Sequence, residues 1–265
     1  MADTDQVKLV LNPGGVVAPI LRTLQETLEV LSISVIAVQA ADLSQPAPHV
    51  GNWVGLRFEG NARPPEEKKF AYLNWLFSKG FQEFSRGVRH ALEEAYLFVE
   101  IIRDVQGRDG AMTWGDMQPV IERSRQRASK MNFPDLMAGV NKGLSSPLHF
   151  EEEFLSLQKV RNCLEHRNGV VGNDDVSKET GRLTLTFPRF VVFVTKNGND
   201  VEIGPGHTVE AGELIGFKLA SGIREFKLGA RIGFSADDLA QIGWGCWAFA
   251  DDLRRKLPKL KADEP

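Results

Sequence analysis

The sequence predicts a mainly α-helical protein of the α+β class, a helical bundle with a small antiparallel β insertion before its last helix. Apolar residues recur at spacings of three and four over residues 14–41 and again over 66–103, as in helices that pack lengthwise against partners. Over residues 182–234 the pattern changes to alternating and β-branched runs separated by glycines, which indicates short strands. A further helical pattern over 235–258 returns the chain to the bundle.

A chain of 265 residues can hold one large globular domain or two small ones, and we expect a single domain over residues 1–265. Charged residues make up 25% of the chain and hydrophobic residues 42%, both ordinary for such a domain. A net charge of -3 argues against a general nucleic-acid coat protein, which would carry a basic excess. We expect a bundle over residues 14–169, completed by the helix over 235–258, with the β-rich insertion at 182–234.

The chain is expected to be cytoplasmic. Its first residues, Met-Ala-Asp-Thr-Asp, lack the positive start and apolar run of a secretion signal. The most apolar stretch, 30–41, contains serines and a glutamine and is too short to cross a bilayer, so no membrane segment is expected. Cys163 and Cys246 both fall on apolar helical patterns, which predicts buried, reduced thiols rather than a disulfide.

The first two helices are the longest that the pattern predicts. The helix over 66–103 would approach about 57 Å, at about 1.5 Å per residue. It contains Gly80 and Gly87, which allow a kink or a close crossing. The connection over 43–65 is irregular, and we expect its apolar residues to pin it to the core. These residues are Trp53, Val54, Leu56 and Phe58.

A third helix is predicted over 113–130, with Thr113 as its cap, and a short helix over 133–141 follows it. The second half of the third helix is locally basic. Such a run is usually a solvated face, but it also supplies the best candidates for phosphate contacts in the N-terminal half. The candidates are Arg123, Arg125, Arg127 and Lys130.

The stretch from Ser146 to Gly169 is predicted to be one helix with both ends marked. Ser146 can accept hydrogen bonds from the first-turn amides, and Pro147 fits the first helical position. Asn168 and Gly169 are natural stop residues, because both tolerate the left-handed conformation that often ends a helix.

An arginine interrupts the apolar stripe of this helix. Phe150, Phe154, Leu157 and Leu164 follow the spacing of a buried face. Arg161 falls on the same stripe, seven residues after Phe154, where a leucine would be ordinary. Burying a cation in that position is costly unless an acidic partner or a bound ligand neutralises its charge.

The β-rich insertion is expected to form an antiparallel sheet of about four to six strands. Its candidate strands cover 183–187, 190–195, 201–203, 214–219 and 224–228. Asn197-Gly198 is typical of a hairpin turn. Ser235 is then expected to cap the last helix, with Asp237 and Asp238 in its first turn.

Several kinds of site are not indicated. The sequence holds no phosphate-binding glycine loop and no dinucleotide fingerprint, and neither cysteine has a metal-ligand spacing. No cofactor and no metal are therefore expected. Three histidines without obvious partners are expected in loops or on the surface, namely His49, His149 and His207. His90 and Glu94 are four residues apart and form either a second polar cluster or part of a solvated face.

What remains is the group formed by Arg161, Asn162 and His166. Arginine can hold a phosphate through two hydrogen bonds, and histidine can exchange protons near neutral pH. With a polar amide, these groups suffice to cleave RNA through its own 2′-hydroxyl without a metal. Asn162 and His166 share a helix face, but Arg161 and His166 lie about 140° apart by the 3.6-residue period. We therefore expect a partner surface, particularly that of a second subunit, to bring both side chains into one cleft.

These residues resemble the motif of HEPN domains: Arg161-Asn162, three further residues, His166 and then a glycine stop. The resemblance implies a helical bundle that commonly forms a homodimer and acts as a metal-independent endoribonuclease in toxin–antitoxin, defence or RNA-processing systems. It implies that Arg161 and His166 are the catalytic pair and that Asn162 orients the substrate. Arg167 then joins the basic run 123–130 as an expected RNA contact.

Two alternatives stay open from the sequence. Arg161 can be a structural ion-pair partner of Glu165 on the next turn, with His166 bonded to the helix end. The protein can also be a non-catalytic interaction or sensing module of the same shape, which binds a protein or nucleotide through the β region. An antitoxin or a regulatory protein is the partner class that these readings imply.

Overall fold

A computed structural model describes residues 11–45, 63–108, 113–196, 198–204, 206–210 and 212–259. Its elements are α1 (Pro13–Ala40), α2 (Pro65–Gln106), α3 (Trp114–Lys130), α4 (Phe133–Asn141), α5 (Glu151–His166), β1 (Arg182–Lys196), β2 (Asn199–Glu202), β3 (Leu214–Lys227) and α6 (Ala236–Lys256). The predicted class is confirmed: the protein is mainly helical, with a small antiparallel sheet before the last helix. The expected anchors of the connection over 43–65 lie outside the described residues.

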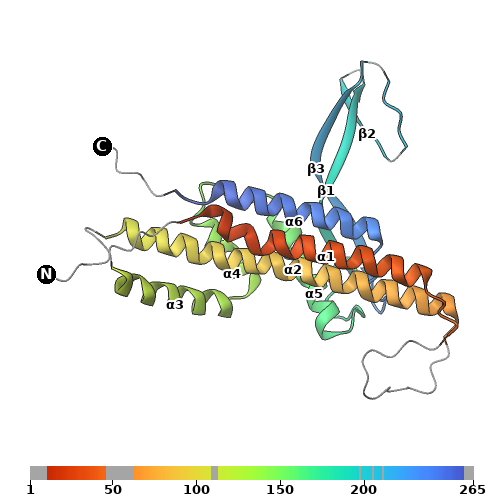
Figure 1. Cartoon of the computed structure of the whole chain (residues 1–265), viewed down its shortest axis with the longest axis horizontal. Coiled ribbons are helices and arrows are strands. Elements are labelled where there is room, and N and C mark those ends of the chain that lie inside the picture. Colours follow the sequence, from red (N-terminus) through yellow and green to blue (C-terminus); the bar gives the residue numbers. More distant parts are fainter. Residues whose placement is uncertain are drawn as a thin grey trace.

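Helices α1, α2 and α6 form the long body of the molecule and lie side by side along its length (Figure 1). The predicted glycines of α2 face α1 at two contacts. A Cβ atom on Gly80 would lie 2.6 Å from Leu31, and one on Gly87 would lie 3.3 Å from Thr23. The absence of side chains at these two positions therefore allows the two helices to approach closely.

Helices α3 and α4 pack against α2 and begin and end as predicted. Thr113 and Asp116 form a capping box at the start of α3, in which each side chain accepts a hydrogen bond from the other residue's amide. Leu136, Met137 and Val140 of α4 are fully buried. These helices extend the hydrophobic core along one end of the body.

The predicted start of α5 at Ser146 and Pro147 is wrong. The helix begins at Glu151, after Phe150 in the left-handed conformation (φ 59°). The preceding segment is occupied by other contacts: the Pro147 carbonyl accepts a 2.6 Å hydrogen bond from Lys256 Nζ, and the Leu148 amide donates to Asn141. These tertiary contacts with α6 and α4 replace the continuation of the helix.

The predicted end of α5 is confirmed. Asn168 and Gly169 have φ values of 51° and 73°, and the Gly169 amide donates to the Cys163 carbonyl. This left-handed turn satisfies a helix-end carbonyl and redirects the chain into the loop before β1.

The sheet of the described residues has three strands, in the order β2-β1-β3, rather than the predicted four to six. Two pairs of predicted segments are each one continuous strand. Pro188 does not interrupt β1, because β2 pairs only with Phe193–Lys196 and leaves one side of β1 open at the proline. Gly222 does not interrupt β3, since the Phe187 ring of the opposite strand lies over it.

The sheet joins the body by its proximal half and projects from it by its distal half (Figure 1). Leu183, Leu185 and Phe187 of β1 are buried in the core, and β1 packs against both α5 and α6. The cysteine prediction is confirmed, since Cys163 and Cys246 are both buried free thiols. No helix among the described residues is long and apolar enough to cross a membrane.

Candidate functional site

The C-terminal half of α5 lies between α2 and the proximal sheet. Leu157 and Leu164 are buried, and Gln158 donates a hydrogen bond to the Ser85 carbonyl of α2. These contacts fix the rotation of α5 about its own axis. They therefore decide which side chains face solvent and which face the bundle.

Arg161 is half-buried and bound within its own helix. Its Nη2 lies 2.7 Å from Glu165 Oε2, and 26% of its side chain is exposed. The Nε atom is buried and has no hydrogen-bond partner among the described residues. The observed geometry matches the alternative in which Arg161 and Glu165 form a structural ion pair.

Asn162 and His166 lie on the outer face of the same helix, and both are exposed. Lys159 precedes Asn162 by three residues and His166 by seven, so all three side chains share that face. Lys159 is exposed as well. Within the part of the chain that the structure describes, none of the three forms an ion pair or side-chain hydrogen bond.

A polar pocket of about 340 Å³ adjoins this row of side chains. Lys159 and Asn162 line it from α5, and Arg182 and Thr184 line it from β1. Arg167 closes it at the end of α5. The pocket therefore gathers three cations beside an exposed histidine, a composition suited to a phosphate group.

Three acidic side chains moderate the charge of this pocket: Asp174 and Asp175 line it, and Glu225 pairs with one of its arginines. Arg167 forms a bidentate ion pair with Asp175, whose side chain is 4% exposed, and Arg182 pairs with Glu225 across the strands. Burial alone would raise the pKa of Asp175, but hydrogen bonds from Arg167 and the Gly172 amide lower it overall. Asp175 is thus held in its charged form and fixes Arg167. Lys159 is the cation of the pocket without an acidic partner among the described residues.

The neighbouring Cys163 is not positioned for nucleophilic chemistry. Burial, together with the nearby Asp175, raises the pKa of its thiol to about 11. Burial likewise raises the pKa of Cys246 to about 12. Reactive cysteines have lowered pKa values, so neither thiol fits a catalytic role.

A larger groove of about 1030 Å³ lies on the opposite side of α5, between its end and the first half of α2. Leu164, Asn168 and Gly169 line it at the end of α5, and Arg231 and Ile232 line it after β3. Phe70 and Trp75 line it from α2. The polar pocket and the groove thus lie on either side of the C-terminal end of α5, which carries Arg161, Asn162 and His166.

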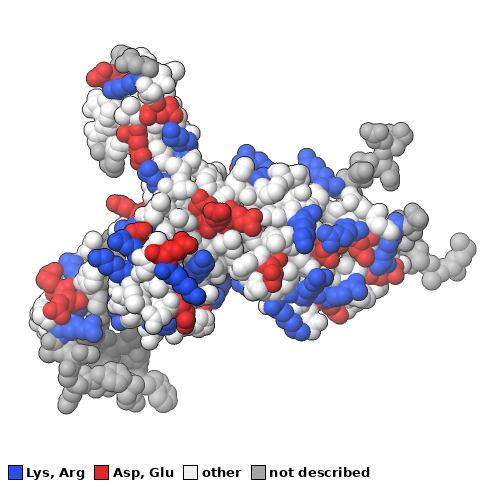
Figure 2. Space-filling model, turned by 180° about the vertical axis from the view of Figure 1, so that it is seen from behind, with Lys and Arg blue, Asp and Glu red and all other residues white. Residues whose placement is uncertain are grey.

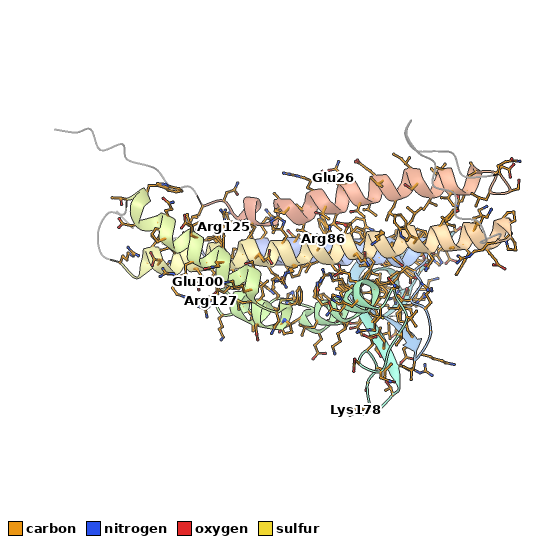
Figure 3. All side chains as sticks on the ribbon, turned by 90° about the horizontal axis from the view of Figure 1, so that it is seen from below. Glu26, Arg86, Glu100, Arg125, Arg127 and Lys178 are labelled. Atoms are coloured by element: carbon orange, nitrogen blue, oxygen red, sulfur yellow. The ribbon has the colours of Figure 1, made fainter. Side chains whose placement is uncertain are left out.

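The basic run of α3 is not brought to α5 within one chain. Its members are all exposed, namely Arg123, Arg125, Arg127 and Lys130. Helix α3 packs against α2, and Figure 3 shows Arg125 and Arg127 well away from Lys178, which lies in the loop after α5. Acidic residues are interspersed with the cations on the face in Figure 2, so no continuous basic track crosses that face.

Three other histidines each lie near one carboxylate, namely His90, His149 and His207. His90 Nε2 lies 3.9 Å from Glu94 on an exposed face of α2. His149 and His207 are exposed and lie in loops, as expected; His149 lies 3.2 Å from Asp252, and His207 lies 3.9 Å from Glu213. His49 lies outside the described residues. Helix or strand spacing in the sequence does not reveal either pair.

Sequence reasoning missed Lys159 and Arg182. Lys159 could have been found, because its spacing of three and seven from Asn162 and His166 defines a common helix face. Arg182 could not, since only the packing of β1 against α5 brings it to the pocket.

The described residues hold no group of three or more histidine, cysteine or acidic side chains arranged to bind a metal ion. Comparisons of this chain with protein-family models, with curated proteins and with solved structures found no match.

Proposed function

We propose that this protein is a metal-independent endoribonuclease of the HEPN type, with His166 as the proton-transfer group. One observation carries the proposal: Lys159, Asn162 and His166 lie in a row without partners among the described residues, beside a pocket that also contains Arg167 and Arg182. An exposed histidine next to unneutralised positive charge is the minimum that RNA cleavage by the 2′-hydroxyl requires.

In the proposed reaction, the RNA's 2′-oxygen attacks the adjacent phosphorus. A bond forms between these two atoms and the bond from phosphorus to the 5′-oxygen breaks, which leaves a 2′,3′-cyclic phosphate and a 5′-hydroxyl. His166 takes the proton of the 2′-hydroxyl and, once protonated, delivers it to the leaving 5′-oxygen. Lys159 stabilises the negative charge on the phosphorane, and the Asn162 amide orients it.

This assignment changes the role of Arg161. The resemblance to HEPN domains implies that Arg161 and His166 form the catalytic pair, but the Arg161 guanidinium is bound to Glu165 and lies about 140° around the helix from His166. We therefore assign the catalytic cation to Lys159 within one chain. Arg161 is left with a structural role within α5, as the ion-pair partner of Glu165.

The test is cleavage of structured and unstructured RNA by the purified chain in EDTA. We expect His166→Ala to lower the cleavage rate by about 10²–10⁴-fold and Lys159→Ala by about 10²-fold. Arg161→Ala is expected to stay within a few-fold of wild type. His90→Ala is the matched control, because it removes another exposed histidine from a helix.

Two results would overturn the assignment. If wild type and His166→Ala cut equally, the assignment of His166 fails, and if neither cuts any RNA, the ribonuclease proposal itself fails. If Arg161→Ala loses as much activity as His166→Ala while Lys159→Ala does not, the catalytic cation is Arg161.

A second candidate function is that of an interaction module, and the surface of α1 favours it. Val30, Ile33 and Ile36 are 61%, 71% and 67% exposed. Exposed apolar side chains at helical spacing are typical of protein-binding surfaces. We infer that this surface binds a second copy of the chain, or an antitoxin or regulatory protein, in the cytoplasm.

A further inference from the structure

The groove between α2 and the end of α5 has the composition of a binding surface for flat, charged ligands. Three aromatic side chains of α2 line it and are unusually exposed: Phe70 by 73%, Trp75 by 60% and Tyr72 by 43%. Exposure of aromatic rings on this scale is unfavourable in water unless a ligand covers them.

Cations are interleaved with these rings. Arg63 lines the groove just before α2 begins, Lys79 lines it from α2 itself, and Arg231 lines it from the segment after β3. Arg231 donates a hydrogen bond to the Asn168 carbonyl, so its guanidinium is held at the end of α5. Two acidic residues, Glu66 and Glu67, also line the groove, in the first turn of α2 near its outer end.

The groove ends beside the proposed catalytic residue. Asn168 and Gly169 form part of its inner wall, and His166 precedes them by only two and three residues. A chain that lies in the groove and continues past Arg231 therefore passes the last turn of α5. The groove and the smaller polar pocket lie on opposite sides of this turn.

We propose that this groove binds single-stranded RNA, with bases stacked on Phe70 and Trp75 and phosphates held by Lys79 and Arg231. Stacking platforms interleaved with cations are the arrangement by which proteins bind single strands without reading sequence. A duplex hides its base faces and cannot use these rings. The proposal rests on the proposed ribonuclease function, to which it adds the substrate class and the path of the strand.

The experiment measures binding separately from cleavage. A fluorescent single-stranded oligonucleotide with 2′-O-methyl groups, which cannot be cleaved through its 2′-oxygens, is titrated into the full chain and followed by anisotropy. We expect Trp75→Ala and Phe70→Ala each to weaken binding by about tenfold. Arg231→Ala is expected to weaken it and to lower the slope of log affinity against log salt by about one.

Trp247→Ala is the matched control, because Trp247 is 50% exposed on α6 and does not line the groove. If Trp75→Ala and Trp247→Ala bind the oligonucleotide equally, or if the wild-type chain does not bind it, the groove assignment is overturned. If the groove variants lose binding and yet no RNA is cut by wild type, the groove assignment stands and the ribonuclease proposal fails. Circular dichroism of each variant confirms that the fold is intact.

Discussion

The ion pair between Arg167 and Asp175 connects the C-terminal end of α5 to the loop that follows it. The Asp175 carboxylate accepts hydrogen bonds from the Arg167 guanidinium and from the Gly172 amide, and 4% of its side chain is exposed. A buried carboxylate with these partners is stable only in its charged form. The pair therefore fixes both the loop and the wall of the polar pocket.

Replacing Asp175 by asparagine should lower the free energy of unfolding by about 1–3 kcal/mol at pH 7, because the charge-assisted bonds are lost. The pKa of Asp175 is lowered from its ordinary value of 3.8. Its contribution is therefore complete above about pH 3.8 and is lost as the pH falls through the folded-state pKa. Urea unfolding of both proteins between pH 3 and pH 7 measures the difference. A difference that stays constant down to pH 3, or is absent at pH 7, would contradict this account.

At the scale of single residues, the sequence predicts which helix face a side chain occupies better than it predicts which residues that side chain contacts. It identified Arg161 as an arginine on a buried stripe, and the structure shows it half-buried on that face. The alternative of a bond to Glu165 was visible because the two residues are four apart. The pocket could not be predicted, because Arg182 reaches α5 from a strand that begins 16 residues after His166.

At the scale of elements, the contact between α6 and β1 depends on a missing side chain. A Cβ atom on Gly245 would lie 2.6 Å from the Pro188 carbonyl oxygen, which belongs to the strand backbone and cannot move aside. On Gly243, two residues earlier in α6, a Cβ atom would make an ordinary 3.7 Å contact with Phe84. The two glycines thus form a natural matched pair.

Gly245→Ala should lower the free energy of unfolding by about 1–3 kcal/mol, because the helix must shift away from the strand. Gly243→Ala should raise it by up to about 1 kcal/mol, since alanine favours the helix and meets no clash. Urea unfolding of both variants measures the two changes. If both substitutions shift stability in the same direction by the same amount, the contact between α6 and β1 is not as described.

The elements themselves were largely predictable, because periodicity and capping residues act locally. Thr113 and Ser235 both form capping boxes, as expected of a threonine or serine before an acidic third residue. Ser146 is followed by a proline that suits the first helical position, but it fails as a cap, because Lys256 and Asn141 hold the segment after it. The predicted strand count is wrong for a related reason: the Phe187 ring of β1 covers Gly222, so this glycine does not divide β3 into two strands.

At the scale of the whole molecule, two exposed features extend beyond the candidate site. The sheet projects from the helical body (Figure 1). The outer half of α1 presents Val30, Ile33 and Ile36 to solvent. This part of α1 carries one charged residue between Leu28 and Ala40, namely Glu29. Such a surface suits association with a second copy of the chain.

Sedimentation of the purified chain at micromolar concentrations should therefore show a dimer. Ile33→Glu combined with Ile36→Glu should shift it to the monomer, because two charges would be buried in an apolar interface. Gln25→Glu on the same helix is the control and should leave the dimer unchanged. A wild-type chain that is monomeric throughout, or a control that dissociates to the same extent, would contradict the assignment of this surface.

The central claim, that His166 drives cleavage by the RNA's own 2′-hydroxyl, is tested most directly by changing the substrate. An RNA with one strongly cut position is compared, in EDTA, with the same strand carrying a single 2′-deoxy nucleotide on the 5′ side of that bond. The account predicts a 2′,3′-cyclic phosphate and a 5′-hydroxyl from the all-ribose strand and no cut at the deoxy position. Cleavage at the deoxy position, or equal cleavage by His166→Ala, would contradict it.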